Sequence, residues 1–262
     1  MKNIIKYDFY RLVKSRKLWL VYIVAVALCI YNSISACGGI EQDISVSFLE
    51  LVAKNDSLAL IIPVFVIFFV VDEFASGYMK NTWAIDPFLY MLSKGLCVLL
   101  FSVAYFALTW IVTAVVGTCT FKKFVLVTEA AVKSGWSKAQ LLYCLFNFAC
   151  GIEAGMIAVL ASIIIKTYLP WIIVHFVYKL LAFTLVCDII FWTTGIGNTV
   201  ALLLPLTGGA KYFAFLAEHF ADTVAVGKSM ALNLVLAPFG VVFCWCVAVV
   251  VIGGFVLKRK KI

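Results

Sequence analysis

The chain has 262 residues, of which 65% are hydrophobic and 13% are charged, with a mean hydropathy of +1.10 and a formal net charge of +8. Soluble domains carry about 25% charged residues and about half apolar ones, so this composition excludes a water-soluble fold and predicts an integral membrane protein. Nucleic-acid binding is disfavoured because no polar segment is long enough to fold into a soluble basic surface. The excess of cations is typical of membrane topology and of contact with anionic lipid.

The first segment, residues 1–17, has apolar and basic side chains at helical spacing. The apolar face would contain Ile5, Phe9, Leu12 and Val13, and the opposite face Lys6, Tyr10, Lys14 and Lys17. Asp8 and Arg16 interrupt the apolar edge. We predict an interfacial helix on the cytoplasmic leaflet. The alternative is a basic flank that only sets the topology.

The long apolar stretches predict an all-α membrane protein with a single transmembrane domain. A bilayer core of about 30 Å needs roughly 20 apolar residues in each helix. The six predicted spans cover residues 18–36, 57–73, 95–121, 139–165, 170–192 and 229–257. Residues 193–228 are apolar but broken by glycines, which predicts a re-entrant hairpin on the outer side before the last helix. Two additional spans are the alternative.

The orientation follows from the distribution of lysine and arginine. Six of these cations lie in residues 1–17 and four lie in residues 258–261. Cytoplasmic segments of membrane proteins are enriched in lysine and arginine, and six spans place both ends on one side. The sequence therefore predicts that both termini are cytoplasmic.

Three ionisable residues lie within the predicted spans: Glu153, Lys179 and Asp188. A charge at the bilayer centre costs about 2.5–3.5 kcal/mol on insertion scales, so these side chains should face protein or water. Glu153 and Lys179 could pair between antiparallel neighbouring spans, either as a structural pair or as a substrate or proton site. Gly151 and Gly155 flank Glu153 at the small-xxx-small spacing that allows close helix packing.

Cysteine, histidine and catalytic patterns give no sign of chemistry on this chain. Seven of the nine cysteines fall well inside predicted spans, away from their outer ends, where cysteine behaves as a small hydrophobic residue. Cys37 and Cys119 lie near the outer face, and the sequence does not say whether they approach each other or are oxidised. There is no metal-ligand spacing and no nucleophile motif. We expect neither an enzyme nor a cofactor bound to this chain.

A short polar segment, residues 72–94, separates the second and third predicted spans. Together with the basic amphipathic start and the order of spans, it resembles the permease subunits of type-2 ABC exporters. In that family a Glu-Phe-x-x-Gly-Thr stretch after the second span is followed by Pro, Arg and a Lys that begins the third span. The matching residues are Glu73, Phe74, Gly77, Pro87 and Lys94, whereas Tyr78 and Tyr90 stand where the family has Thr and Arg.

The resemblance implies a half-transporter that pairs with a second permease copy and with a separate ATPase, which would bind ATP and Mg²⁺. The substrate would be an amphipathic peptide antibiotic or toxin, or a lipid-like molecule, exported across a bacterial plasma membrane for resistance or immunity. Asp72 and Glu73 would lie where the second span meets water. The implied ATPase-coupling residues are Asp72, Glu73, Phe74, Gly77, Pro87 and Lys94.

Three alternatives remain open at this point. The first is a secondary transporter or channel that uses Glu153, Lys179 and Asp188 and needs no ATPase. The second is an intramembrane enzyme, and the third is an assembly or immunity factor that does not transport.

Overall fold

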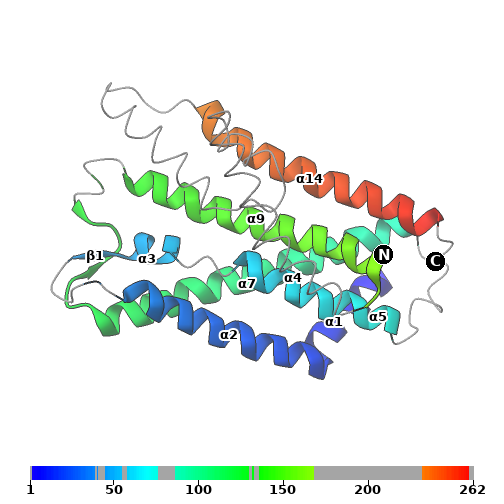
Figure 1. Cartoon of the computed structure of the whole chain (residues 1–262), viewed down its shortest axis with the longest axis horizontal. Coiled ribbons are helices and arrows are strands. Elements are labelled where there is room, and N and C mark those ends of the chain that lie inside the picture. The colour runs from blue at the N-terminus through cyan, green and yellow to red at the C-terminus, as the bar shows by residue number, and fades with distance from the viewer. Residues whose placement is uncertain are drawn as a thin grey trace, which may run out of the picture.

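The computed structural model describes residues 2–38, 40, 45–54, 58–75, 86–129, 132, 136–167 and 232–259. These residues are mostly helical and form an elongated bundle, with helices running side by side along the long axis (Figure 1). The helices are α1 (Lys2–Lys14), α2 (Arg16–Cys37), α3 (Phe48–Lys54), α4 (Leu58–Val66), η1 (Ile67–Val71), α5 (Asp72–Ala75), α7 (Pro87–Thr120), α9 (Trp136–Ile165) and α14 (Leu232–Arg259).

Four helices within the described residues are long and apolar enough to cross a membrane: α2, α7, α9 and the Pro238–Arg259 part of α14. They correspond to the predicted spans at 18–36, 95–121, 139–165 and 229–257. The predicted fifth span at 170–192 and the predicted hairpin at 193–228 lie outside the described residues.

The predicted second span forms the buried centre of the bundle. It consists of α4, η1 and α5, which follow one another without a break, and η1 is a π-helix. This central helix contacts α9, α7 and α2. Phe65 and Phe69 are completely buried within it. Pro63 lies inside α4, one turn before the π-helical segment. The helix that carries Asp72 and Glu73 is therefore the most enclosed one.

Helix α7 begins at Pro87, earlier than the predicted boundary at residue 95. The carboxylate of Asp86 caps it by accepting hydrogen bonds from the backbone N–H groups of Phe88 (2.8 Å) and Leu89 (3.4 Å). Proline is favoured at the first helical position because its missing N–H would have no partner there. The helix extends eight residues before the predicted span because Lys94, which limits the charge-free stretch, lies inside the helix, where its charge is neutralised by other segments.

Small residues allow the central helix to pack closely against its neighbours. A Cβ atom on Gly155 of α9 would lie 2.5 Å from Val98 of α7 and 2.6 Å from Ile62 of α4. This glycine therefore has a packing role, as predicted for the small-xxx-small pair. Helices α2 and α7 also share a hydrogen bond between the hydroxyl groups of Ser33 and Thr113, at 3.1 Å.

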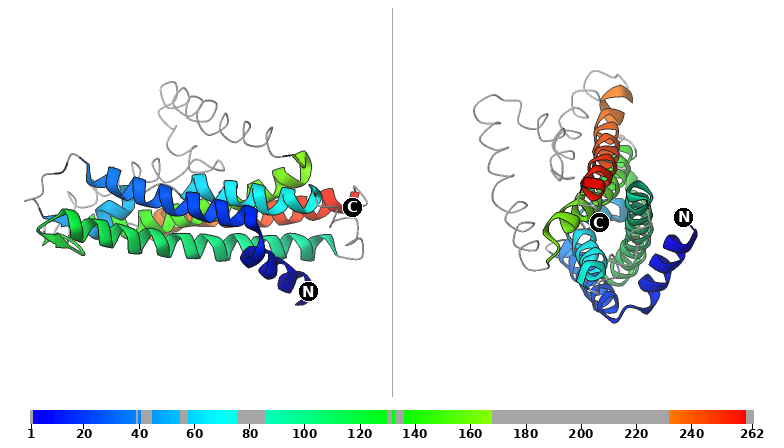
Figure 2. Two further views of the ribbon diagram at one scale, coloured as in Figure 1. Left: turned by 90° about the horizontal axis from the view of Figure 1, so that it is seen from below. Right: turned by 90° about the vertical axis from the view of Figure 1, so that its right-hand side faces the viewer.

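The two ends of the bundle differ in structure. At one end, the short strands β1 (Val46–Ser47) and β2 (Phe124–Val125) pair in parallel and join the segments that follow α2 and α7. At the other end, α1 is tilted away from the long helices, and the end of α14 lies nearby (Figure 2). A separate amino-terminal helix is confirmed, and both chain ends lie toward the same end of the bundle.

Candidate functional site

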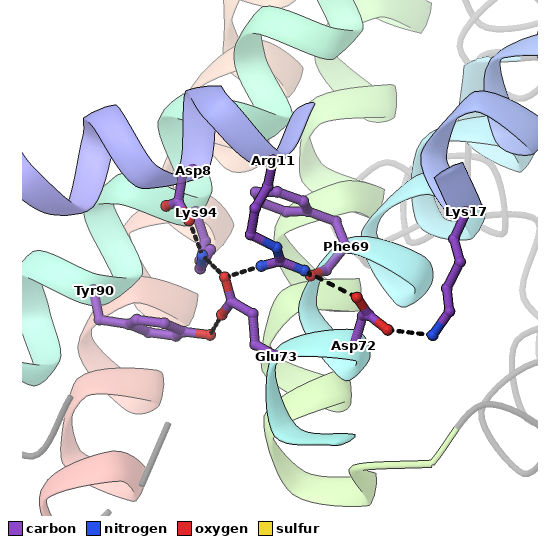
Figure 3. Close-up of polar contacts among 8 residues, drawn as sticks. All are labelled: Asp8, Arg11, Lys17, Phe69, Asp72, Glu73, Tyr90 and Lys94. Atoms are coloured by element: carbon purple, nitrogen blue, oxygen red, sulfur yellow. Dashed lines mark hydrogen bonds and ion pairs between the residues drawn. The ribbon is translucent and has the colours of Figure 1, made fainter. Parts of the chain in front are cut away.

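Three helices meet through charged side chains at the end of the bundle where α1 lies (Figure 3). Glu73 of α5 is at the centre and is completely buried. Its Oε1 accepts hydrogen bonds from Nη1 of Arg11 on α1 and from Nζ of Lys94 on α7. Its Oε2 accepts a 2.6 Å hydrogen bond from the hydroxyl group of Tyr90. One carboxylate therefore connects α1, α5 and α7.

Lys94 also contacts a second buried carboxylate, that of Asp8. Its Nζ donates to Oδ1 of Asp8 at 2.6 Å, and the hydroxyl group of Ser93 donates to Oδ2 of Asp8 at 2.6 Å. The same ammonium lies 4.7 Å from the centroid of the Phe69 ring. Asp8 and Lys94 are at most 1% exposed. Lys94 therefore bridges Asp8 of α1 and Glu73 of α5 within a nearly water-free environment.

The network continues toward the surface through Arg11 and Asp72. Arg11 donates to the carbonyl oxygen of Phe69 at 2.9 Å and lies 3.5 Å from a carboxylate oxygen of Asp72. Phe69 belongs to η1, where the regular hydrogen-bond ladder of the α-helix is interrupted. Lys17 of α2 also donates to Asp72, and the Lys17 side chain is about half exposed. The network thus extends from the buried Asp8–Lys94 pair to the partly exposed Lys17–Asp72 pair.

The charges of this network balance. It contains three carboxylates and three cations: Asp8, Asp72, Glu73, Arg11, Lys17 and Lys94. Desolvating a charge costs several kcal/mol, and this is offset only when partners and additional hydrogen bonds are well placed. Every buried charge here has at least one ion-pair partner and one further polar contact. The arrangement holds the three helices in one relative position.

No protein-family model and no curated protein matches the sequence. The function must therefore be argued from the network itself. Its side chains hold each other, so it offers no free group for acid–base or nucleophilic chemistry. The network can pass movement from one helix to another, because displacing α1 would displace the central helix and the start of α7.

Several residues predicted for ATPase coupling are brought together here. Glu73 and Lys94 form a direct ion pair, and Pro87 begins the helix that carries Lys94. Phe74 lies one residue beyond Glu73, and its ring centroid is 5.3 Å from Nζ of Lys166, at the end of α9. Gly77 lies outside the described residues.

The two acids predicted at the water boundary differ in their exposure to solvent. Its carboxylate is completely buried, whereas Asp72 is 22% exposed. The reason is that α1 folds back over the end of the central helix and supplies Arg11 as a buried partner. Glu73 therefore lies inside this charge network, and Asp72 lies at its outer, partly exposed edge.

Sequence reasoning missed Asp8, Arg11 and Ser93. Asp8 was interpreted as a break in the apolar edge of the amino-terminal helix, yet it is the side chain that faces inward. One signal was available, because Asp8 is the single acid in a segment of six cations and Arg11 follows it at i+3, on the same helical face. The partners on α5 and α7 could not be inferred from that spacing.

The second predicted polar site is described only in part. Glu153 is 3% exposed within α9, which agrees with the expectation that its side chain faces protein. Lys179 and Asp188 lie outside the described residues, so the predicted Glu153–Lys179 pair remains a prediction. Within the described ranges, no group of three or more His, Cys, Asp and Glu residues could hold a metal ion.

Proposed function

We propose that this chain is the transmembrane subunit of an ATP-driven exporter, working with a separate ATPase that binds ATP and Mg²⁺ and with a second permease copy. The proposed substrate is an amphipathic peptide antibiotic or toxin, or a lipid-like molecule, moved across a bacterial plasma membrane. The observation that carries the proposal is the buried joint of Asp8, Arg11, Glu73 and Lys94, which connects an amino-terminal helix to the central helix.

A soluble ATPase can move membrane helices only through a rigid contact. Helix α1 has one face in the joint and one face exposed, with Lys6 and Lys14 on the exposed side. A force applied to this exposed face would pass through the Asp8–Lys94 and Arg11–Glu73 ion pairs. It would then move α7 and the central helix together.

This geometry supports a division of roles among the residues matched to the permease family. Glu73 and Lys94 would act inside the joint as transmitting residues and would not touch the ATPase. The ATPase would contact the exposed face of α1 and the segment between α5 and α7. The central helix would then be the element whose displacement changes the path between the two permease copies.

The test is co-purification of the chain with the ATPase encoded beside it, followed by ATP hydrolysis measurements in lipid vesicles. We expect the wild-type pair to co-purify and a scrambled 78–86 segment to abolish the complex. Glu73→Gln should leave the complex intact but reduce the coupling of ATP hydrolysis to transport. Lys123→Gln, at the opposite end of the bundle, is the control. A wild-type chain that purifies alone and does not alter nucleotide hydrolysis would contradict the proposal.

A further inference from the structure

An apolar groove of about 350 Å³ lies between α1, α2 and α7. It is lined by two alanines and by larger apolar and aromatic side chains. Its lining consists of Phe9, Leu12, Tyr22, Ala25, Val26, Leu100, Phe101, Ala104, Tyr105 and Leu108. Phe9 is 51% exposed and Val26 39% exposed, so the groove opens on the outer surface of the bundle.

The walls of the groove are held in place before any molecule binds. The hydroxyl group of Tyr22 donates to the carbonyl oxygen of Leu12 at 2.8 Å, and the indole of Trp19 donates to that of Val13 at 2.9 Å. These bonds satisfy carbonyls in the last turn of α1, which have no partner within the helix. The Tyr22 ring also stacks on Phe101 at 6.0 Å. A preformed groove loses little conformational entropy when it is filled.

The direction of the groove matches that of a lipid tail. Its residues on α7 run from Leu100 to Leu108, which is about 12 Å along a helix. Both α2 and α7 are long enough to cross a membrane, so the groove runs parallel to the direction of acyl chains. Helix α1 closes it at one end with Phe9 and Leu12.

Charge at the closed end favours an anionic headgroup. Beside Phe9, the outer face of α1 carries Lys6, Tyr10 and Lys14, all exposed, and Arg16 is exposed at the start of α2. Of the acids near this end, Asp8 and Glu73 are buried and paired, Asp72 pairs with Arg11 and Lys17, and Asp86 caps α7, so none of them is paired with these outer cations. Exposed lysines beside an apolar surface attract anionic lipid.

We propose that this groove binds one acyl chain of an anionic phospholipid, whose headgroup contacts the exposed cations of α1. The lipid would lie against α1, α2 and α7 at the same time and would stabilise the tilted position of α1. The headgroup would use the same exposed face of α1 that the proposed ATPase contacts, so lipid and ATPase would compete for these cations; the groove itself is tested without the ATPase.

The experiment uses the full chain in phosphatidylcholine vesicles containing a photoreactive phosphatidylglycerol with a diazirine in its acyl chain. Cross-linked residues are located by mass spectrometry. We expect labelling concentrated on groove residues such as Phe101 and Leu108. Ala104→Phe should fill the groove and reduce this labelling several-fold, whereas Ala107→Phe, also exposed on α7 but outside the groove, should not. Both variants must retain wild-type thermal stability in detergent.

The headgroup is tested separately. Lys6→Gln with Lys14→Gln should reduce labelling by phosphatidylglycerol but not by a photoreactive phosphatidylcholine, and Lys122→Gln with Lys123→Gln is the control at the other end of the bundle. Uniform labelling of all lipid-facing helices, or labelling insensitive to Ala104→Phe, would overturn the acyl-chain site. Equal labelling by both lipids would overturn the anionic preference. Groove residues protected in a dimer and labelled only in the monomer would show that a second copy covers the groove, which also overturns the proposal.

Discussion

Replacing Lys94 by methionine tests whether the charge network holds the bundle together. Methionine is similar in length and apolar, so the change removes the cation that lies between the buried carboxylates of Asp8 and Glu73. Glu73 would keep Arg11, but Asp8 would lose its direct cation. Removing one partner of a buried ion pair costs about 3–5 kcal/mol, because a charge is left in a desolvated position. Lys17→Met removes an exposed pair and should cost no more than about 1 kcal/mol.

The assay is reversible unfolding by SDS titration in mixed micelles, followed by tryptophan fluorescence. The double variant Asp8→Asn/Lys94→Met should be more stable than the sum of its single effects predicts, because it leaves no unpaired charge at Asp8. Equal stability losses for Lys94→Met and Lys17→Met would refute the reasoning. Strict additivity of the Asp8 and Lys94 changes would refute it as well.

Three other predictions follow from the fold. Gly155→Ala should destabilise the protein by about 1–3 kcal/mol because its new Cβ would lie 2.5 Å from a neighbouring side chain. Gly240→Ala, whose Cβ would have nothing within 4 Å, should instead stabilise the protein by up to about 1 kcal/mol. Both changes are measured by the same SDS titration. Asp86→Ala should cost about 0.5–2 kcal/mol and speed amide hydrogen exchange in the first turn of α7, whereas Asp86→Asn should retain most of the cap. In single-cysteine variants in intact cells, a membrane-impermeant maleimide should label the exposed Cys119 but not the buried Cys29. Cys119 lies near the end of α7 opposite to the termini, so it should face the outside if the termini are cytoplasmic. Labelling of Cys119 only after permeabilisation would contradict cytoplasmic termini.

The apolar elements could be predicted from the sequence because lipid imposes a simple requirement on them. A helix in hydrocarbon must be apolar over its whole length, so charge-free stretches located α2, α9 and α14 to within a few residues. The same rule did not locate the start of α7. Lys94 limits the charge-free stretch that predicted the third span, whereas the two carboxylates around it allow the helix to begin earlier, at Pro87.

The candidate site could be predicted only in part. Glu73 and Lys94 were singled out from their places beside two apolar stretches and from the resemblance to the permease family, and the structure brings them together. The burial of Glu73 could not be predicted, because it depends on α1 folding over the end of the central helix. The role of Asp8 was missed for the same reason, since its partner is 86 residues further along the chain. Helical periodicity reports the faces of one helix and not which distant segment covers each face.

This long separation also has a consequence for biosynthesis. At about 5–20 residues per second, Lys94 is synthesised roughly 4–17 s after Asp8. During that interval Asp8 lacks its cation partner on α7, and its charge must stay hydrated at the membrane surface. The amino-terminal helix therefore takes its final position only after the third long apolar segment has begun to leave the ribosome. A nascent chain arrested before residue 94 would keep this helix undocked and open to proteolysis.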